Sequence, residues 1–545
     1  MSKRVTSWCV EIFFVVVLFY MWAWVGVWFN QDAMRSPDVL LPITQFTEGH
    51  LAATVVGVVE WNNDSLFDFY TDDIGWPDGL SYRPMMWPTI VLGVLLGPVY
   101  ALNLIWSYTL AVNAVSGFFL VRVLGLSRIS AMVAGSLVAW NPWVRTTLSN
   151  GQFEQSYIGA IALLWGMVLL AEKNPKTGII GTFFVVLFGG LAAPNCLLTG
   201  LMGLPLLGIW RIFGNVRRTP RWFGCAVATI CAGLLVNSYQ SEGFDSDKPQ
   251  FFAPRRSDDA SMTNTASWES LWNAPTESYA NNQVAHISYQ GEIWPTVGII
   301  GGILGGGIGH MGVVAALELV HISLGPTVDI QGETYYLPVS WLAYYIPILE
   351  RSGSYYRFAM GGFVSFALCG AAFLDRIRRF SLLLAVPVSL YILQEAWEET
   401  KGMNGHPIPM TASMAFAHTE VDSLRGGKGP VLGLPLLKNS NCDKEAVGYV
   451  KEYWQHERPI LHTMAPPVRY RSNEPKIARL LNVLDDIECS TKIETTIQRM
   501  GIGAIVLYLD GACTFSNAQK QCLIDGLGVP QKGRDVWIWD GLLSK

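Results

Sequence analysis

The stretch WNPWVRTTLSNGQFEQSYIGAIALLWGMVLL, from Trp140 to Leu170, places a polar segment between two apolar runs. The apolar flanks suit lipid. The arginine, asparagines, glutamines and glutamate between them need water or a polar substrate. A short loop between two membrane spans, facing the outer side, meets both needs. Working outward from this stretch, apolar runs and polar connections alternate along most of the chain.

The composition indicates a membrane protein. The chain has 545 residues, of which 51% are hydrophobic and 15% charged, whereas soluble domains carry about 25% charged residues. The 21 tryptophans suit a protein with many bilayer interfaces to anchor. The net charge of −5 and the lack of dense Lys/Arg blocks argue against a nucleic-acid partner. A polytopic membrane domain with one soluble domain fits these values.

Hydropathy predicts about 11 spans, since about 20 apolar residues cross a bilayer. The first is Trp8–Phe29, which is too long for a signal peptide and lacks a cleavage site. The others cover 99–121, 129–144, 157–172, 177–193, 196–212, 222–238, 295–309, 311–325, 356–374 and 381–397. Basic residues occupy alternate connections, which predicts a cytoplasmic N-terminus. The glycine-rich run 294–325 is expected to be a hairpin of two spans; a single span there would invert the later orientation.

The expected fold is therefore mostly α: a polytopic bundle with a small extracytoplasmic α/β domain. Residues 1–397 form the membrane domain, with large outward loops at 30–98 and 239–293, and 398–545 form the second domain. In that domain, buried strands are expected at 430–437, 502–508 and 536–539. Helical spacing covers 443–456, 474–484, 490–500 and 515–525. An interfacial or re-entrant helix is expected at Pro84–Pro98.

Four cysteines lie in the polar C-terminal part: Cys442, Cys489, Cys513 and Cys522. Four cysteines allow three pairings, and four unrelated thiols are the alternative. If this part lies outside the cytoplasm, Cys513 and Cys522 are the expected pair, because they are close in sequence across one short helix or loop.

The first outward loop holds the main candidates for catalysis. Asp32 and Asp38 follow the first span directly, so their backbone is held at the membrane surface. A carboxylate there can act as a general base or hold a divalent cation against a phosphate. Glu48 and His50 form a second acid/base candidate. The structural alternatives are a helix cap or solvated loop for the aspartates and a structural hydrogen bond for His50.

Two further outward segments carry candidate residues. Glu154 is a third catalytic carboxylate, and a salt bridge with Arg145 is the alternative reading. Arg351 and Arg357 precede a late span and can clamp a phosphate, or else snorkel to lipid head groups. We expect Glu154 and the Asp32/Asp38 segment to line one cleft, with Arg351 or Arg357 on its rim. A divalent cation is compatible with such a site, but no sequence motif requires a metal or another cofactor.

The order of several loose motifs resembles the GT-C superfamily of bacterial integral-membrane glycosyltransferases. The resemblance is carried by WPDGLSYRPMMWPTIVLGVLLGPVYALNLIWSYTLAV, SRISAMVAGSLVAWNPWV, NGQFEQ, LPVSWLAYYIPILERSGSYYRF and PVLGLP. It implies a polyprenyl-phosphate-sugar donor, an outward active site, and Asp32 or Asp38 as the base. Gln152 stands where many members of that superfamily carry histidine, and a tight acidic pair after the first span is missing.

Two functions follow from the resemblance and the residues. In the first, the protein transfers a sugar from a polyprenyl-phosphate-linked donor to a glycan, lipid or protein acceptor outside the cytoplasm. In the second, the scaffold is catalytically silent and binds lipid or other subunits of an envelope complex. A transporter ranks third, because acidic residues within the spans are scarce: Glu11 and Glu318 stand out. The expected location is a bacterial inner membrane.

Overall fold

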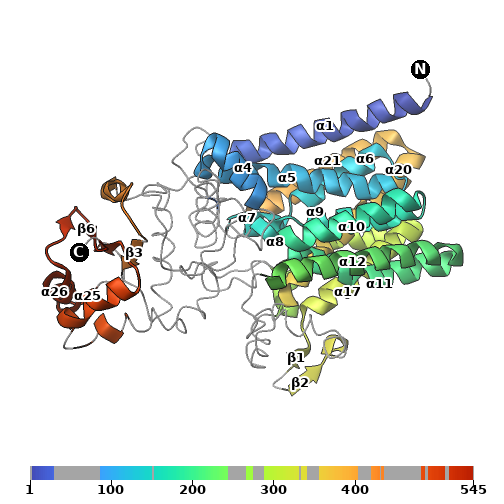
Figure 1. The fold of residues 1–545 in the computed structure, drawn as a ribbon. Coiled ribbons are helices and arrows are strands. Elements are labelled where there is room, and N and C mark those ends of the chain that lie inside the picture. The colour runs from blue at the N-terminus through green and yellow to red at the C-terminus, as the bar shows by residue number, and fades with distance from the viewer. Residues whose placement is uncertain are drawn as a thin grey trace. The chain divides into compact units, whose positions relative to one another are not determined.

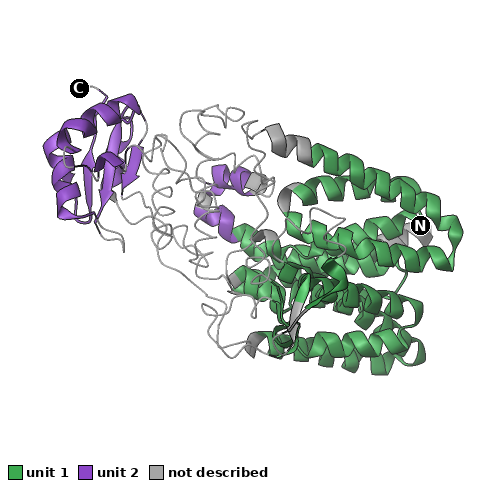
Figure 2. Cartoon of the chain, turned by 90° about the horizontal axis from the view of Figure 1, so that it is seen from below, with its two compact units in different colours: residues 1–31, 104–410 green, residues 32–103, 411–545 purple. Residues whose placement is uncertain are grey.

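The computed structural model divides into two compact units, shown in Figure 2. Unit 1 contains residues 1–31 and 104–410, and unit 2 contains residues 32–103 and 411–545. The structure describes residues 3–29, 54, 86–149, 153–242, 265–273, 288–330, 333–340, 355–402, 419–429, 431–434, 480, 482–484, 486, 489–509 and 515–543.

Unit 1 is a bundle of helices that run side by side (Figure 1). A helix lies at each expected span: α1 (Lys3–Phe29), α5 (Pro98–Val123), α6 (Arg128–Ala139), α9 (Gly159–Ala171), α10 (Pro175–Ala192), α11 (Pro194–Gly214), α12 (Thr219–Glu242), α16 (Ile293–Leu304), α17 (Gly306–Ser323), α20 (Met360–Phe380) and α21 (Leu382–Gly402). Among the described helices, six segments are long and apolar enough to cross a membrane. The protein is therefore a helical membrane protein, and a full set of 11 spans stays a prediction.

The expected span 129–144 is shorter than predicted, because α6 ends at Ala139. Asn141 causes the break by bonding to both sides of it. Its amide nitrogen donates to the carbonyls of Leu137 and Val138, and its amide oxygen accepts from the backbone N–H of Val144. The side chain thus caps the end of α6 and the start of α7 (Pro142–Ser149). A helix of 12 residues is about 18 Å long, too short to cross a bilayer alone.

The glycine-rich run forms two helices, α16 and α17, as the hairpin interpretation predicts. Both open ends lie beside the short helix α14 (Trp268–Trp272): Gln290 N–H donates to Leu271 O, and Ala266 N–H donates to Ser323 O. The helices meet through glycine, since a Cβ added at Gly309 would lie 2.0 Å from the carbonyl oxygen of Gly301. These glycines therefore serve helix packing rather than nucleotide binding. A two-stranded hairpin of β1 (Thr327–Ile330) and β2 (Glu333–Tyr336) follows α17.

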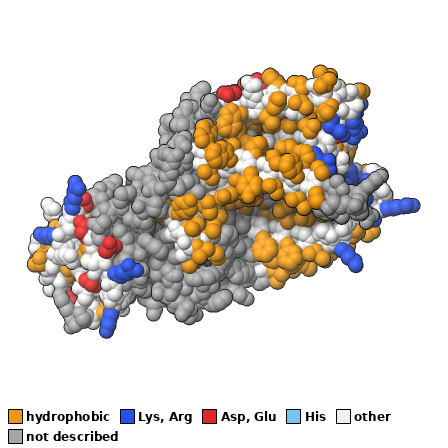
Figure 3. Space-filling model, turned by 90° about the horizontal axis from the view of Figure 1, so that it is seen from above, with side chains coloured by type: hydrophobic (Ala, Val, Ile, Leu, Met, Phe, Trp, Pro, Cys, Tyr) orange, Lys and Arg blue, Asp and Glu red, His pale blue; other side chains and the backbone are white. Residues whose placement is uncertain are grey.

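Hydrogen bonds draw the basic connections of unit 1 together at one end of the bundle. The bonded pairs are Glu11 with Arg122 and Arg128, Val123 O with Lys173, Ser127 N–H with Asp375, and Glu172 with Arg211. Figure 3 shows Lys and Arg side chains gathered at one end of unit 1, and hydrophobic side chains over the face beside them. This clustering is the pattern that the predicted topology requires. The side of the membrane that this end faces stays a prediction.

Unit 2 contains a four-stranded sheet with strand order β3-β4-β6-β5. The strands are β3 (Val431–Leu434), β4 (Ala504–Tyr508), β5 (Gln531–Lys532) and β6 (Val536–Trp539), and the first pair is parallel. Helices α25 (Cys489–Arg499) and α26 (Asn517–Leu527) pack on one face, and the 3-10 helix η5 (Thr419–Leu424) contributes to the core on the other. β3, β4 and β6 lie within the predicted strands. The helix α4 (Met86–Leu96) lies within the segment Pro84–Pro98, and its interfacial or re-entrant location stays a prediction. The expected helix 443–456 lies outside the described residues.

The disulfide of unit 2 differs from the prediction. Cys522 is bonded to Cys489, with 5.7 Å between their Cα atoms, and not to Cys513, which lies outside the described residues. The two bonded cysteines are 33 residues apart, but α25 and α26 pack against each other and bring them together. Both side chains are buried in the core between the helices. Sequence proximity was therefore the wrong guide, because tertiary packing of two helices selects the partner.

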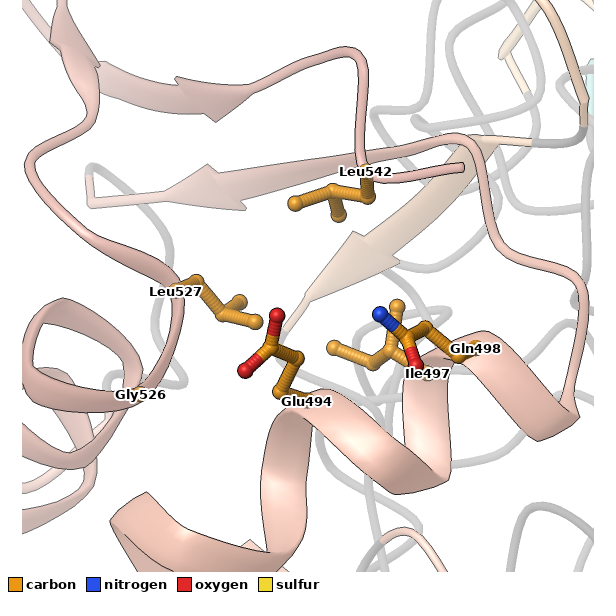
Figure 4. Close-up of a pocket in the computed structure, with 6 residues that line it drawn as sticks. All are labelled: Glu494, Ile497, Gln498, Gly526, Leu527 and Leu542. Carbon is orange, nitrogen blue, oxygen red and sulfur yellow. The ribbon is translucent and has the colours of Figure 1, made fainter. Parts of the chain in front are cut away.

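A small cavity between α25, α26 and the C-terminal segment is shown in Figure 4. It is lined by Glu494, Ile497, Gln498, Gly526, Leu527 and Leu542 and has a volume of about 30 Å³. A space of this size holds one or two water molecules. It is far too small for a sugar or a lipid phosphate.

Candidate functional site

The polar segment between Trp140 and Leu170 is fixed by hydrogen bonds with side chains of α5. Trp106 Nε1 donates to Leu148 O at 3.1 Å, near the end of α7. Asn113 donates to Ser156 O at 2.8 Å and accepts from Gly159 N–H at 2.9 Å. Ser156 is the last residue of the short helix α8 (Phe153–Ser156). These side chains satisfy the backbone groups left over where the helices break, so the polar segment has a fixed conformation.

Gln155 lies within this segment, and its side-chain oxygen makes no hydrogen bond with the described residues. Its backbone carbonyl accepts from Trp143 Nε1 at 2.8 Å and from the Cys196 thiol at 3.7 Å. Its side-chain oxygen Oε1 is buried and has no hydrogen-bond partner among the described residues. A buried amide oxygen without a donor costs about 1–3 kcal/mol. That atom is therefore available to a water molecule or a ligand with an N–H or O–H group.

Arg145 places a positive charge in the same segment. The residue lies in α7 and is 4% exposed. Burial lowers the pKa of its guanidinium to about 10, because desolvation disfavours the charged form. The group nevertheless remains protonated at neutral pH.

Arg357 reaches this region from the 3-10 helix η3 (Tyr355–Ala359), which leads into α20. Its Nη1 donates to Asn195 Oδ1 at 3.1 Å, and its guanidinium lies 5.8 Å from the ring centre of Tyr356. Its Nε is buried and finds no acceptor among the described residues. Arg357 therefore has a buried N–H group without an acceptor in the described part of the chain, and an anion is a natural acceptor for it.

Other contacts fix η3 against its surroundings. The rings of Tyr356 and Trp143 lie 6.3 Å apart, so η3 packs against α7 at Trp143. Gln290 Nε2 donates to Ala359 O at 3.1 Å, at the other end of η3. The segments that carry Arg145 and Arg357 are therefore neighbours in unit 1. These packed segments carry two arginines, an Arg357 N–H without a described acceptor and a Gln155 amide oxygen without a described donor, groups of the kind that bind phosphates and hydroxyls.

A neighbouring carboxylate serves a structural role. Glu399, near the end of α21, accepts from the backbone N–H groups of Glu292 and Ile293 and from the Tyr289 hydroxyl at 3.2 Å. It thereby caps the start of α16 from another helix. Burial raises the pKa of Glu399 and outweighs these hydrogen bonds. Burial and the Glu399 charge also raise the pKa of Tyr289.

The structure describes only part of the predicted site. Asp32, Asp38, Glu48, His50, Gln152 and Arg351 lie outside the described residues, and of Glu154 only the backbone, in α8, is described. Arg145 and Arg357 are both described and belong to adjoining segments. The predicted cleft between Glu154 and the aspartates, and the salt bridge of Glu154 with Arg145, both stay predictions.

Sequence analysis missed Asn195 and Gln155. Asn195 lies in APNC, between the predicted spans 177–193 and 196–212, and its polar side chain in that short turn was the available signal. Gln155 lies beside Glu154, whose charge makes it the more obvious candidate in the sequence. The bond of Asn195 to Arg357 and the buried, unbonded Oε1 of Gln155 depend on how distant segments pack.

Solved structures of other proteins resemble the fold of this chain. No protein-family model and no curated protein sequence matches the chain. Its structure is similar to the arabinofuranosyltransferase AftD from Mycobacteria, with a TM-score of 0.52 and 14% identity over 99% of this chain. That match spans 40% of the AftD chain. It is also similar to ArnT from Cupriavidus metallidurans bound to undecaprenyl phosphate, with a TM-score of 0.52 and 12% identity over 96% of this chain and 97% of ArnT.

At these identities the likeness concerns the fold, and it extends over nearly the whole chain in both comparisons. It agrees with the bundle of apolar helices and with the order of motifs in the sequence. The protein is a helical membrane protein with a GT-C-like fold.

Proposed function

We propose that the protein is a membrane glycosyltransferase that takes a sugar from a polyprenyl-phosphate-linked donor. The observation that carries the proposal is Arg357, whose buried Nε–H has no acceptor among the described residues, in a unit with a GT-C-like fold. Arg357 and Arg145 would hold the donor phosphate, and Gln155 Oε1 would accept from a sugar hydroxyl or a water. The ArnT structure, which contains undecaprenyl phosphate, has the same type of fold.

The chemistry needs a base that the described residues do not supply. The acceptor hydroxyl oxygen attacks the anomeric carbon while the bond from that carbon to the phosphate oxygen breaks, which inverts the anomeric centre. The acceptor proton passes to a carboxylate, for which Asp32 or Asp38 is proposed, with Glu154 as a further candidate. The leaving polyprenyl phosphate gains negative charge, which the two arginines stabilise.

The outward location of the reaction is part of this proposal. The clustering of basic connections at one end of unit 1 supports a cytoplasmic location for that end. The Cys489–Cys522 disulfide supports an oxidising compartment for unit 2, because disulfides are rare in the cytosol. The acceptor is a glycan, lipid or protein in that compartment.

Donor binding is tested with undecaprenyl phosphate and the purified full chain in nanodiscs, followed by intrinsic tryptophan fluorescence. Removing a charge-assisted hydrogen bond costs about 1.5–3 kcal/mol, so Arg357→Gln should weaken binding about 10- to 100-fold. Arg217→Gln is the control, since Arg217 is exposed in the 3-10 helix Val216–Arg218. Equal affinity of Arg357→Gln and the wild type would refute the phosphate role of Arg357.

The second candidate function is a catalytically silent, lipid-binding subunit of an envelope complex. The same phosphate site serves both functions, so the test must address the base. The double variant Asp32→Asn/Asp38→Asn, and the single variant at whichever of the two is the base, should abolish sugar transfer but leave undecaprenyl phosphate binding intact. If both variants, and the double variant, fully restore growth and envelope composition in a deletion strain, the scaffold function is the correct one.

A further inference from the structure

A single carboxylate at one end of unit 1 holds the connection between α11 and α12. Glu172 directly follows α9 and is the only acidic residue in the segment 171–224. Its carboxylate oxygens accept from Arg211 Nε at 3.0 Å and from Trp222 Nε1 at 3.1 Å. Arg218 Nε lies 3.4 Å from the same carboxylate. The connection between α11 and α12 is therefore docked against the end of α9.

Basic side chains outnumber this carboxylate. Arg221 of α12 donates to the backbone carbonyl of Glu172, and Lys173 donates to the backbone carbonyl of Val123. A carbonyl has no net charge, so neither bond neutralises its cation. Lys176, in the first turn of α10, is exposed. We call five residues around Glu172 the basic rim: Lys173, Lys176, Arg211, Arg218 and Arg221. One carboxylate opposes these cations, so the rim keeps a net positive charge.

The arginines of the basic rim are both held in place and accessible. Arg211 uses its Nε and Nη2 groups on Glu172, which leaves further N–H donors on the same guanidinium. The side chains of Arg211 and Arg218 remain partly exposed. Side chains that are already fixed lose less entropy when they bind a ligand. The remaining donors suit a phosphate, which accepts several hydrogen bonds.

An exposed apolar stripe on α10 begins one turn after Lys176. Ile180 and Phe188 are each 57% exposed, and Phe184 is 47% exposed. These residues follow Lys176 at steps of four, so they lie along the same side of the helix. The rings of Phe184 and Phe188 stack with their centres 6.0 Å apart. An acyl chain on this stripe would have its polar end at Lys176.

The helices α10 and α12 lie side by side and start at the same end (Figure 1). A Cβ added at Gly224 would lie 2.7 Å from the side chain of Ile179. One added at Gly190 would lie 3.1 Å from the side chain of Val236. Early residues of one helix thus meet early residues of the other, and late residues meet late ones, so the helices run parallel. Arg221, in the first turn of α12, is therefore on the same level as the first turn of α10.

The basic rim is separate from the site around Arg357. Asn195, which binds Arg357, lies in the first turn of α11, whereas Arg211 lies in its last turn. At 1.5 Å per residue these two positions are about 24 Å apart along the helix. A phosphate bound at the rim would therefore belong to a different molecule from a phosphate held by Arg357.

We propose that the basic rim binds the phosphate of an anionic phospholipid, with an acyl chain along the stripe of Ile180, Phe184 and Phe188. A soluble anion or an acidic protein segment would meet the charges alone, whereas a membrane lipid meets the charges and the stripe with one molecule. Basic pockets between membrane helices bind anionic lipid head groups in this way. The inference is independent of the proposed function.

Binding is measured by native mass spectrometry of the full chain in detergent, titrated with phosphatidylglycerol or with phosphatidylcholine of the same acyl chains. The wild type should prefer phosphatidylglycerol. Each Lys or Arg beside an anionic lipid contributes about 5-fold to its affinity, so Lys176→Gln/Arg221→Gln should bind phosphatidylglycerol about 30-fold more weakly. Arg376→Gln/Arg378→Gln is the matched control: it removes two exposed arginines at the end of α20 and should bind as the wild type does.

The melting temperature in phosphatidylcholine should be the same for the wild type and Lys176→Gln/Arg221→Gln, because both side chains are exposed. If it is lower, Lys176→Gln alone decides the point and should bind phosphatidylglycerol about 5-fold more weakly. Equal affinity of the wild type for both lipids, or equal losses in the site and control variants, overturns the proposal. Glycerol phosphate that binds as tightly as phosphatidylglycerol would replace the lipid with a soluble anion. Polyglutamate that displaces phosphatidylglycerol at equal concentration would replace it with an acidic protein partner.

Discussion

Arg357 and Asn195, which are 162 residues apart in the sequence, are joined by a hydrogen bond of 3.1 Å from Nη1 to Oδ1. The bond holds one nitrogen of the guanidinium, whereas its Nε is buried and has no acceptor among the described residues. One end of Arg357 is thus fixed by the protein, and the other is available. Such partial satisfaction is expected of a residue that holds a ligand rather than of one that only stabilises the fold.

Asn195→Ala should weaken donor binding without removing the charge of Arg357. The loss of one orienting hydrogen bond is worth about 1 kcal/mol, which corresponds to about a 5-fold weaker affinity for undecaprenyl phosphate. The titration used for Arg357→Gln measures it. Asn215→Ala is the control, because Asn215 caps the 3-10 helix Val216–Arg218 and is exposed. Equal affinities of Asn195→Ala and Asn215→Ala would show that Asn195 does not position Arg357.

Gly309→Ala should destabilise the pair of helices α16 and α17. The added Cβ would lie 2.0 Å from the carbonyl oxygen of Gly301, so the helices must separate. Overpacking of this kind costs about 1–3 kcal/mol, seen as a lower melting temperature in detergent. Gly307→Ala is the matched control: nothing lies within 4 Å of its added Cβ, and alanine favours helix over glycine. A drop for Gly307→Ala equal to that for Gly309→Ala would contradict the packing argument.

Peptide mapping without reduction should recover a linked peptide containing Cys489 and Cys522. Cys522→Ser should lower the free energy of unfolding of unit 2 by about 2–4 kcal/mol, since the bond restricts the unfolded chain. Cys513→Ser should leave the linked peptide intact. Recovery of a Cys513–Cys522 peptide instead would restore the pairing that the sequence suggested.

Val529→Cys should report the side of the membrane on which unit 2 lies. Val529 is 84% exposed. A maleimide that cannot cross the inner membrane should therefore label the new cysteine in cells whose outer membrane is permeabilised and whose inner membrane is intact. Arg217→Cys, in a chain whose unpaired native cysteines are replaced by serine, should label only after the inner membrane is permeabilised. Reversal of these two patterns would invert the topology.

Local patterns determined much of the fold. The apolar runs predicted a helix at every expected span, because lipid demands continuous apolar segments with internally bonded backbones. Alternating basic connections predicted the cluster formed around Glu11, Arg122 and Lys173. The apolar strands of unit 2 were equally visible, since buried strands are short runs of aliphatic residues.

Only the tertiary structure decided which distant groups meet. The sequence showed Arg357 as a charge near a span, but the helix packing of unit 1 gave it Asn195 as a partner and left its Nε unused. The packing of α25 on α26 likewise gave Cys522 the partner Cys489 over the nearer Cys513. The physical reason is the same in both cases. The hydrophobic periodicity of a segment shows which of its faces is buried or exposed to lipid. Side-chain pairing depends instead on how separate segments pack against each other, which no local pattern encodes.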